Sequence, residues 1–124
     1  MSCFELCCKA HFSAAHFLRG YNGDCARLHG HNWHVRLYVK CEQLDKLGMG
    51  IDYAVMKREL KQALACWDHY HLNEIPPFDR INPTSENVAA ELYKQLRPRL
   101  ENERLTISRI EIAETCTASV TYWP

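Results

Sequence analysis

The stretch Phe4-Glu-Leu-Cys-Cys-Lys-Ala-His-Phe-Ser-Ala-Ala-His16 decides the first part of the fold. Apolar or small side chains occupy every second position, and the polar side chains Glu5, Lys9 and His11 lie between them. Successive side chains of a strand point to opposite faces, so this alternation predicts a half-buried β-strand over Phe4–His16. The range 31–41 alternates in the same way and predicts a second strand.

Two helices are predicted after these strands. Asp52 is suited to be the N-cap of the first helix. Apolar residues follow it at helical spacing: Met56, Leu60, Ala63, Leu64 and Trp67. The segment Asn82-Pro-Thr-Ser-Glu86 has the cap residues and the proline that mark a second helix start, and Pro98 is expected to end that helix. Two closing strands are expected over 106–113 and 119–123.

The order β-β-α-α-β-β predicts an α+β domain. Its four-stranded antiparallel sheet would carry both helices on one face, and the other face would be solvated or buried against another subunit. A chain of 124 residues is expected to form one domain, over 1–124.

Composition excludes several classes of protein. The 15 Lys and Arg residues balance 15 Asp and Glu residues, which argues against a protein that binds nucleic acid. The seven cysteines are odd in number, and no signal peptide opens the chain, so reduced cysteines and a cytoplasmic location are expected. No apolar run approaches the roughly 20 residues of a membrane-spanning helix, which predicts a soluble protein without a membrane partner.

A histidine pair is the most informative chemical feature. His29 and His31 lie two residues apart, so in an extended chain both imidazoles point the same way. His16 closes the first predicted strand and is the natural third ligand if the two strands pair. Three neutral imidazoles with one open position suit a catalytic Zn²⁺ ion. A structural zinc held by Cys25, His29 and His31, and surface histidines that bind no metal, remain open alternatives.

Several motifs, in this order, resemble the family of 6-pyruvoyltetrahydropterin and 6-carboxytetrahydropterin synthases over nearly the whole chain. They are Phe12-Ser-Ala-Ala-His16, Cys25-Ala-Arg-Leu-His29-Gly-His31, Gly50-Ile-Asp-Tyr53, Trp67-Asp-His-Tyr-His-Leu-Asn73, Asn82-Pro-Thr-Ser-Glu-Asn87 and Glu114-Thr-Cys-Thr-Ala118. The resemblance implies a tunnelling fold, in which the sheets of several subunits join into a barrel. It also implies a homohexamer, a dimer of trimers, with active sites at subunit interfaces.

The resemblance further implies roles for individual residues. The Zn²⁺ ligands would be His16, His29 and His31. Cys25 would be a general base, Asp68 and His69 would relay protons with it, and Glu114 would anchor the pterin ring. Other residues of the pterin pocket would be Thr84, Ser85 and Glu86, although Ser85 and Glu86 are also ordinary helix-start residues.

For the reaction, the resemblance implies conversion of 7,8-dihydroneopterin triphosphate to 6-carboxy-5,6,7,8-tetrahydropterin. Acetaldehyde and triphosphate would be released, and the pathway would be queuosine (deazapurine) biosynthesis. Cys25 and His29 are separated by three residues, as in the carboxy type, whereas the pyruvoyl type has a longer gap. A 6-pyruvoyltetrahydropterin synthase and a non-catalytic zinc-bearing assembly module are the alternatives. Arg19 and Arg27 are candidates to meet the triphosphate.

Overall fold

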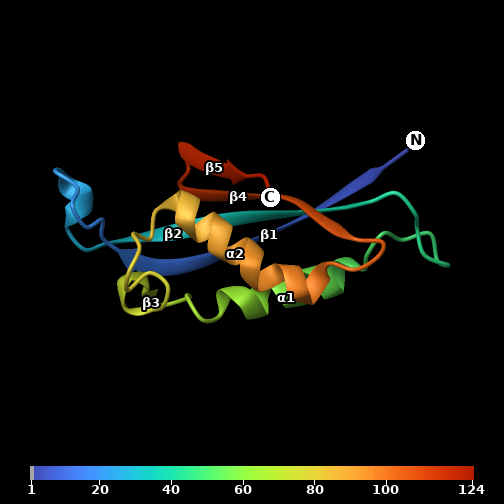
Figure 1. Cartoon of the computed structure of the whole chain (residues 1–124), viewed down its shortest axis with the longest axis horizontal. Coiled ribbons are helices and arrows are strands. Elements are labelled where there is room, and N and C mark those ends of the chain that lie inside the picture. The colour runs from blue at the N-terminus through green and yellow to red at the C-terminus, as the bar shows by residue number, and fades with distance from the viewer. Residues whose placement is uncertain (1) are drawn as a thin grey trace.

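The structure is a computed structural model that describes residues 2–124. Its elements in chain order are β1 Phe4–His16, the short 3-10 helix η1 Asp24–Ala26, β2 His29–Cys41, α1 Tyr53–Leu64, β3 Tyr70–His71, the 3-10 helix η2 Leu72–Glu74, α2 Ser85–Leu100, β4 Thr106–Thr115 and β5 Ala118–Tyr122. The long strands lie side by side, and both α-helices cover one face of the sheet (Figure 1). The α+β class and the placing of both helices on one face are therefore confirmed.

One five-stranded sheet runs through the molecule in the order β3-β1-β2-β4-β5. All neighbouring strands are antiparallel except β3, which pairs in parallel with Ala14 and Ala15 of β1. The sequence predicted four strands and missed β3. A strand of two residues is too short to show an alternation of polar and apolar side chains, so no local pattern could have revealed it.

The core lies between the sheet and the two helices. Phe12 of β1 pairs with Trp33 of β2, and the two rings stack with their centroids 5.6 Å apart. Trp67 also packs against Phe12, with the ring centroids 5.7 Å apart, although it lies beyond the end of α1 rather than on it. The helix-covered face of β1 and β2 therefore carries their buried side chains, and the opposite face carries their exposed polar ones.

Both predicted helix starts are confirmed by their caps. The Asp52 carboxylate accepts a hydrogen bond from the backbone N–H of Ala54 at 2.8 Å. The Thr84 hydroxyl accepts one from the backbone N–H of Asn87 at 3.1 Å. These side chains satisfy N–H groups that have no partner within the first helical turn.

The predicted end of α2 at Pro98 is wrong. The helix continues through Pro98 to Leu100, whose side chain is buried in the core. Proline lacks the N–H that would reach back to the preceding turn, but the backbone N–H of Glu101 still donates to the carbonyl of Arg97 at 2.9 Å. Burial of Leu100 and this last turn together favour helix beyond the proline.

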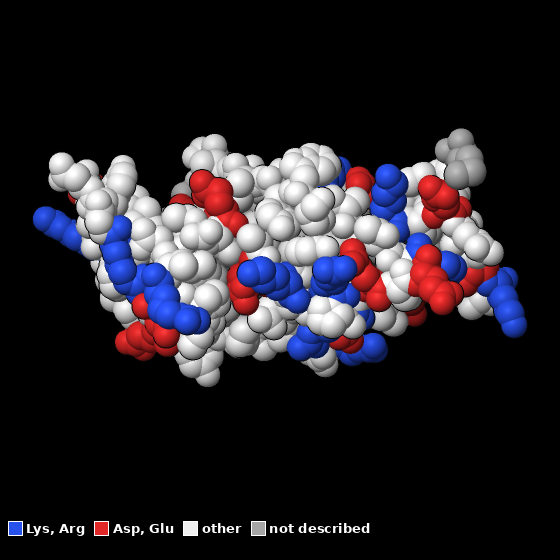
Figure 2. Space-filling model, viewed as in Figure 1, with Lys and Arg blue, Asp and Glu red and all other residues white. Residues whose placement is uncertain are grey.

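The strand boundaries differ slightly from the predictions. β1 has the predicted bounds, whereas β2 begins two residues earlier than predicted, at His29. On the face shown in Figure 2, basic and acidic side chains are intermingled, as the balanced composition suggests. Among residues 2–124, no helix is both long and apolar enough to cross a membrane. All seven cysteines are free thiols.

Candidate metal centre

Three histidines meet at one end of the β1–β2 ladder. His16, the last residue of β1, is directly opposite His29, the first residue of β2. His31 lies two residues further along β2 and therefore on the same face. One ring nitrogen from each histidine lies within 4.8 Å of the other two. Strand pairing thus brings His16 of β1 close to His29 and His31 of β2.

Backbone carbonyls fix the tautomers of two of these histidines. The Nδ1 atom of His16 lies 2.7 Å from the carbonyl oxygen of Pro83, and Nδ1 of His29 lies 2.7 Å from that of Arg27. A carbonyl can only accept, so each Nδ1 carries the proton and each Nε2 keeps a free lone pair. Such a second hydrogen bond is typical of metal-binding histidine.

Burial disfavours the charged forms of His16 and His31. Desolvation lowers the pKa values of His16 and His31, and the nearby Glu114 carboxylate only partly opposes this shift. Their Nε2 atoms are buried and have no hydrogen-bond partner among residues 2–124. Neutral imidazoles with unsatisfied nitrogen atoms fit a divalent cation, and an all-histidine set with room for a further ligand suits Zn²⁺.

Glu114 lies beside the histidine cluster. One carboxylate oxygen is 3.9 Å from Nε2 of His16, and the other is 3.8 Å from Nε2 of His31. The side chain comes from β4, just beyond Ala113, which lies opposite His34 of β2. A ligand held by Glu114 would therefore lie beside the histidine cluster.

The beginning of α2 is also tied to this cluster. Pro83, whose carbonyl binds His16, precedes Thr84, and Thr84 is occupied as the N-cap of the helix. Ser85 is partly buried, whereas Glu86 is exposed. The structure thus places this segment next to His16, and among residues 2–124 no hydrogen bond or ion pair joins the side chain of Ser85 or Glu86 to the histidines.

A clamp that sequence reasoning missed holds the segment after His16. The buried Asn73 side chain accepts from the N–H of Phe17 at 2.9 Å and donates to its carbonyl at 3.0 Å. Asn82 makes the same two contacts with the backbone of Arg19. Each side-chain amide thus makes the two backbone hydrogen bonds that a neighbouring strand would otherwise make with that residue. Asn73 ends the motif Trp67–Asn73 and Asn82 begins the motif Asn82–Asn87. Their places in these motifs are the signal by which the sequence could have indicated a role for them.

The guanidinium of Arg19 completes this clamp. It donates to the carbonyls of Asn73, Phe78 and Ile81, at 3.3, 2.8 and 3.3 Å. These bonds use three of the five N–H groups of the guanidinium and position the chain between His16 and Cys25. The expectation that Arg19 meets a triphosphate stays a prediction.

Asp68 and His69 lie at the outer edge of β1. The Asp68 carboxylate accepts from the N–H of Ser13 at 2.9 Å, and this hydrogen bond is the main cause of its lowered pKa. Nδ1 of His69 lies 3.0 Å from the same carboxylate, and the imidazole is largely exposed. His69 also has a positive φ of 65°, a costly conformation for a residue with a side chain.

Cys25 lies in η1 and is partly buried. Its carbonyl accepts from the N–H of Leu18 at 2.7 Å, which closes the loop that follows β1. Among residues 2–124, no hydrogen bond joins Cys25 to Asp68 or His69. One copy of the chain therefore does not assemble these three predicted residues into a hydrogen-bonded relay.

Comparison with known proteins gives matches along the whole chain. Residues 5–124 match the family described as 6-pyruvoyl tetrahydropterin synthase. A 6-carboxy-5,6,7,8-tetrahydropterin synthase of Synechocystis sp. is 35% identical over 117 residues, covering 90% of this chain and 87% of that protein. The protein of the same name from Bacillus subtilis is 34% identical over 128 residues, which cover 98% of this chain and 86% of that protein.

A solved structure agrees with these sequence matches. The 6-pyruvoyl tetrahydropterin synthase of Caenorhabditis elegans superposes with a TM-score of 0.87 at 27% identity. The superposition covers 100% of this chain and 97% of that one. The arrangement of strands and helices is therefore shared with the C. elegans protein.

Proposed function

This chain belongs to the 6-pyruvoyl tetrahydropterin synthase family, and on that premise we propose that it is a zinc-dependent carbon–carbon lyase of the carboxy type. Its substrates would be 7,8-dihydroneopterin triphosphate and one molecule of water. The products would be 6-carboxy-5,6,7,8-tetrahydropterin, acetaldehyde and triphosphate, in cytoplasmic queuosine biosynthesis. The observation that carries the proposal is the cluster of three imidazoles beside the Glu114 carboxylate.

The histidine cluster supplies one half of the proposed site. His16, His29 and His31 would hold the metal through their Nε2 atoms, since Nδ1 of His16 and of His29 is engaged by a carbonyl. A bound Zn²⁺ ion would polarise substrate oxygen atoms and stabilise negative charge that develops on them. Trp33 packs edge-on against His16 and His31, which keeps water from that side of the cluster.

Glu114 supplies the other half. The pyrimidine edge of a pterin offers a ring N–H and an amino group side by side, and one carboxylate can accept from both. Glu114 lies within 4 Å of two proposed metal ligands, His16 and His31. A pterin ring bound by Glu114 would therefore place the substrate's own side chain next to the metal. Thr84, Ser85 and Glu86 at the start of α2 would line the same pocket.

Cys25, Asp68 and His69 would handle protons. Cys25 would act as the general base in its thiolate form. Asp68 would hold the tautomer of His69 through the 3.0 Å contact with Nδ1, leaving Nε2 to exchange a proton. Since a single copy does not join Cys25 to this pair, the proposal places the pair of one copy in the site of another.

The sheet has two open edges that support such an assembly. β3 covers β1 only at Ala14 and Ala15, so the outer edge of β1 from Phe4 to Phe12 has no partner strand among residues 2–124. β5 forms the opposite edge and runs antiparallel to β1. Copies arranged head to tail would extend the antiparallel sheet and close into a ring, which removes both edges. We propose a homohexamer of two stacked trimers.

A 6-pyruvoyltetrahydropterin synthase is the second candidate, because the C. elegans protein of that name shares the fold closely. Two observations favour the carboxy type. Only three residues separate Cys25 from His29, and the relatives at 34–35% identity carry the carboxy name. A shorter gap changes where the base lies relative to the metal, and hence which bond breaks.

Product analysis tests the proposal. The purified protein is incubated with 7,8-dihydroneopterin triphosphate, with and without a chelator, and the products are identified by mass spectrometry. We expect chelator-sensitive formation of 6-carboxytetrahydropterin and acetaldehyde. A 6-pyruvoyl product would leave the metal site in place but contradict the carboxy assignment. A zinc-loaded hexamer without turnover would instead support a non-catalytic assembly module.

A further inference from the structure

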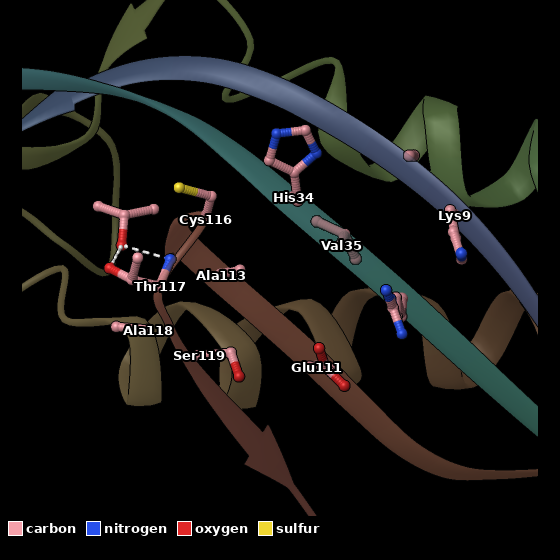
Figure 3. Close-up of a pocket in the computed structure, with 12 residues that line it drawn as sticks. Lys9, His34, Val35, Glu111, Ala113, Cys116, Thr117, Ala118 and Ser119 are labelled. Carbon is pink, nitrogen blue, oxygen red and sulfur yellow. Dashed lines mark hydrogen bonds between the residues drawn. The ribbon is translucent and has the colours of Figure 1, made fainter.

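The face of the sheet that the helices leave uncovered carries two unusual rungs of the β1–β2 ladder. Lys9 lies directly opposite Arg36, and His11 lies directly opposite His34. All four side chains are exposed on the same face. Figure 3 shows Lys9 on β1 and His34 on β2 beside the adjoining hollow, with β4 and β5 below them.

The Lys9–Arg36 rung is unfavourable by itself, because like charges directly opposite each other destabilise a sheet. Among residues 2–124, neither side chain takes part in an ion pair or a side-chain hydrogen bond. Another arginine of the same face, Arg109, behaves differently and pairs with Glu5 at 2.9 Å. The two cations therefore have donor groups that no side chain in the described part of the chain, residues 2–124, accepts from.

These cations border a hollow of about 460 Å³. The hollow is closed by the turn between β4 and β5, where the Thr115 hydroxyl accepts from the N–H of Thr117 at 3.3 Å. Ser119 adds a further hydroxyl, and Glu111 is the only carboxylate among the lining residues. Lys9 and Arg36 together with Glu111 leave one net positive charge around the hollow.

We propose that this hollow binds a small polyphosphate anion. Arginine can hold phosphate oxygens with two hydrogen bonds, lysine adds a compact charge, and hydroxyls and imidazole N–H groups supply further donors. The volume lies within the ~300–1,000 Å³ of small-molecule sites, which suits a chain of phosphates. Binding would also remove the repulsion between Lys9 and Arg36, so the anion would stabilise the sheet.

This site is separate from the candidate metal centre. The histidine cluster lies on the helix-covered face, and the Lys9–Arg36 rung lies on the other face of the same two strands. Inorganic triphosphate, the anion that the proposed reaction would release, is the appropriate probe. Its binding is measured without turnover, so this inference and the proposed function can fail independently.

The test is titration calorimetry of inorganic triphosphate into the zinc-loaded protein at constant ionic strength. The double variant Lys9→Ala/Arg36→Ala removes the rung. The matched control Arg58→Ala/Lys94→Ala removes one arginine and one lysine that are exposed on α1 and α2. Both variants have the same net charge, and all three proteins keep the same metal site, so heat from zinc chelation is common to them.

We expect the rung variant to bind triphosphate at least tenfold more weakly than the wild type, and the control to stay within twofold. Triphosphate should raise the melting temperature of the wild type and the control but not that of the rung variant. Equal weakening in both double variants would show only non-specific attraction and overturn the proposal. Absence of binding to the wild type at millimolar triphosphate would also overturn it.

Discussion

Two histidine rungs on the same pair of strands have very different environments. His16 opposite His29 lies on the helix-covered face, and His11 opposite His34 lies on the exposed face. The ring centroids are 4.5 Å apart in the first rung and 6.0 Å apart in the second. Only the first rung has a third histidine within reach, and only its Nδ1 atoms are held by carbonyls.

The difference shows that strand pairing alone does not make a metal centre. Pairing brings two imidazoles together on either face of the ladder. Burial, a third imidazole and a fixed tautomer then distinguish one rung from the other. Among residues 2–124, His16, His29 and His31 form the single group of three or more His, Cys, Asp or Glu side chains that could hold a metal ion.

Removing a ligand of the first rung should have the largest effect. We expect His29→Ala to lower zinc affinity by more than about 100-fold, because even the outer partners of metal ligands contribute 10–100-fold. Turnover should be lost with the metal. Metal content by mass spectrometry, together with the product assay, measures both. A variant that keeps one zinc per chain would show that His29 is not a ligand.

Cys25→Ala asks whether three histidines are sufficient to hold the metal. As a general base, Cys25 should contribute about 10²–10⁴-fold to turnover. We therefore expect that loss with unchanged zinc content and oligomeric state, measured by kinetics, metal analysis and light scattering. Loss of zinc in this variant would instead make Cys25 a ligand, and unchanged function would favour the assembly module.

Asn73→Ala should have an intermediate effect, because it removes support for the first rung without touching a ligand. The change leaves the partly buried N–H and carbonyl of Phe17 without their Asn73 partners, which costs about 1–3 kcal/mol of unfolding free energy. Denaturant unfolding measures this loss. The matched variant Asn82→Ala breaks the equivalent pair with Arg19 at a less buried position and should lose less.

The smallest effect is expected for the second rung. His11→Ala/His34→Ala removes exposed side chains, so the free energy of unfolding should change by no more than about 0.5 kcal/mol. Zinc content should remain at the wild-type value. A fall in bound zinc per chain would show that the exposed His11–His34 rung also holds metal, and would contradict the proposal that only the first rung does so.

Much of the fold was predictable because its signals are local. The alternation over Phe4–His16 predicted β1 with its observed bounds, and Asp52 and Thr84 cap the two helices as their chemistry suggests. The end of α2 was not predictable, because burial of Leu100 outweighs the breaking tendency of Pro98. β3 was missed because two residues carry no periodic pattern.

By itself, the sequence determined four of the five strands, the starts of both helices, the placing of His29 and His31 on one face, and His16 as their third partner. Period-two alternation and helix caps depend on neighbouring residues, so they are visible in the chain. The tertiary structure decided the rest. Pro83 reaches His16 from 67 positions away and Asn73 reaches Phe17 from 56, and such contacts exist only once the core has packed. Likewise, only the register of β1 and β2 places Lys9 opposite Arg36 on the open face.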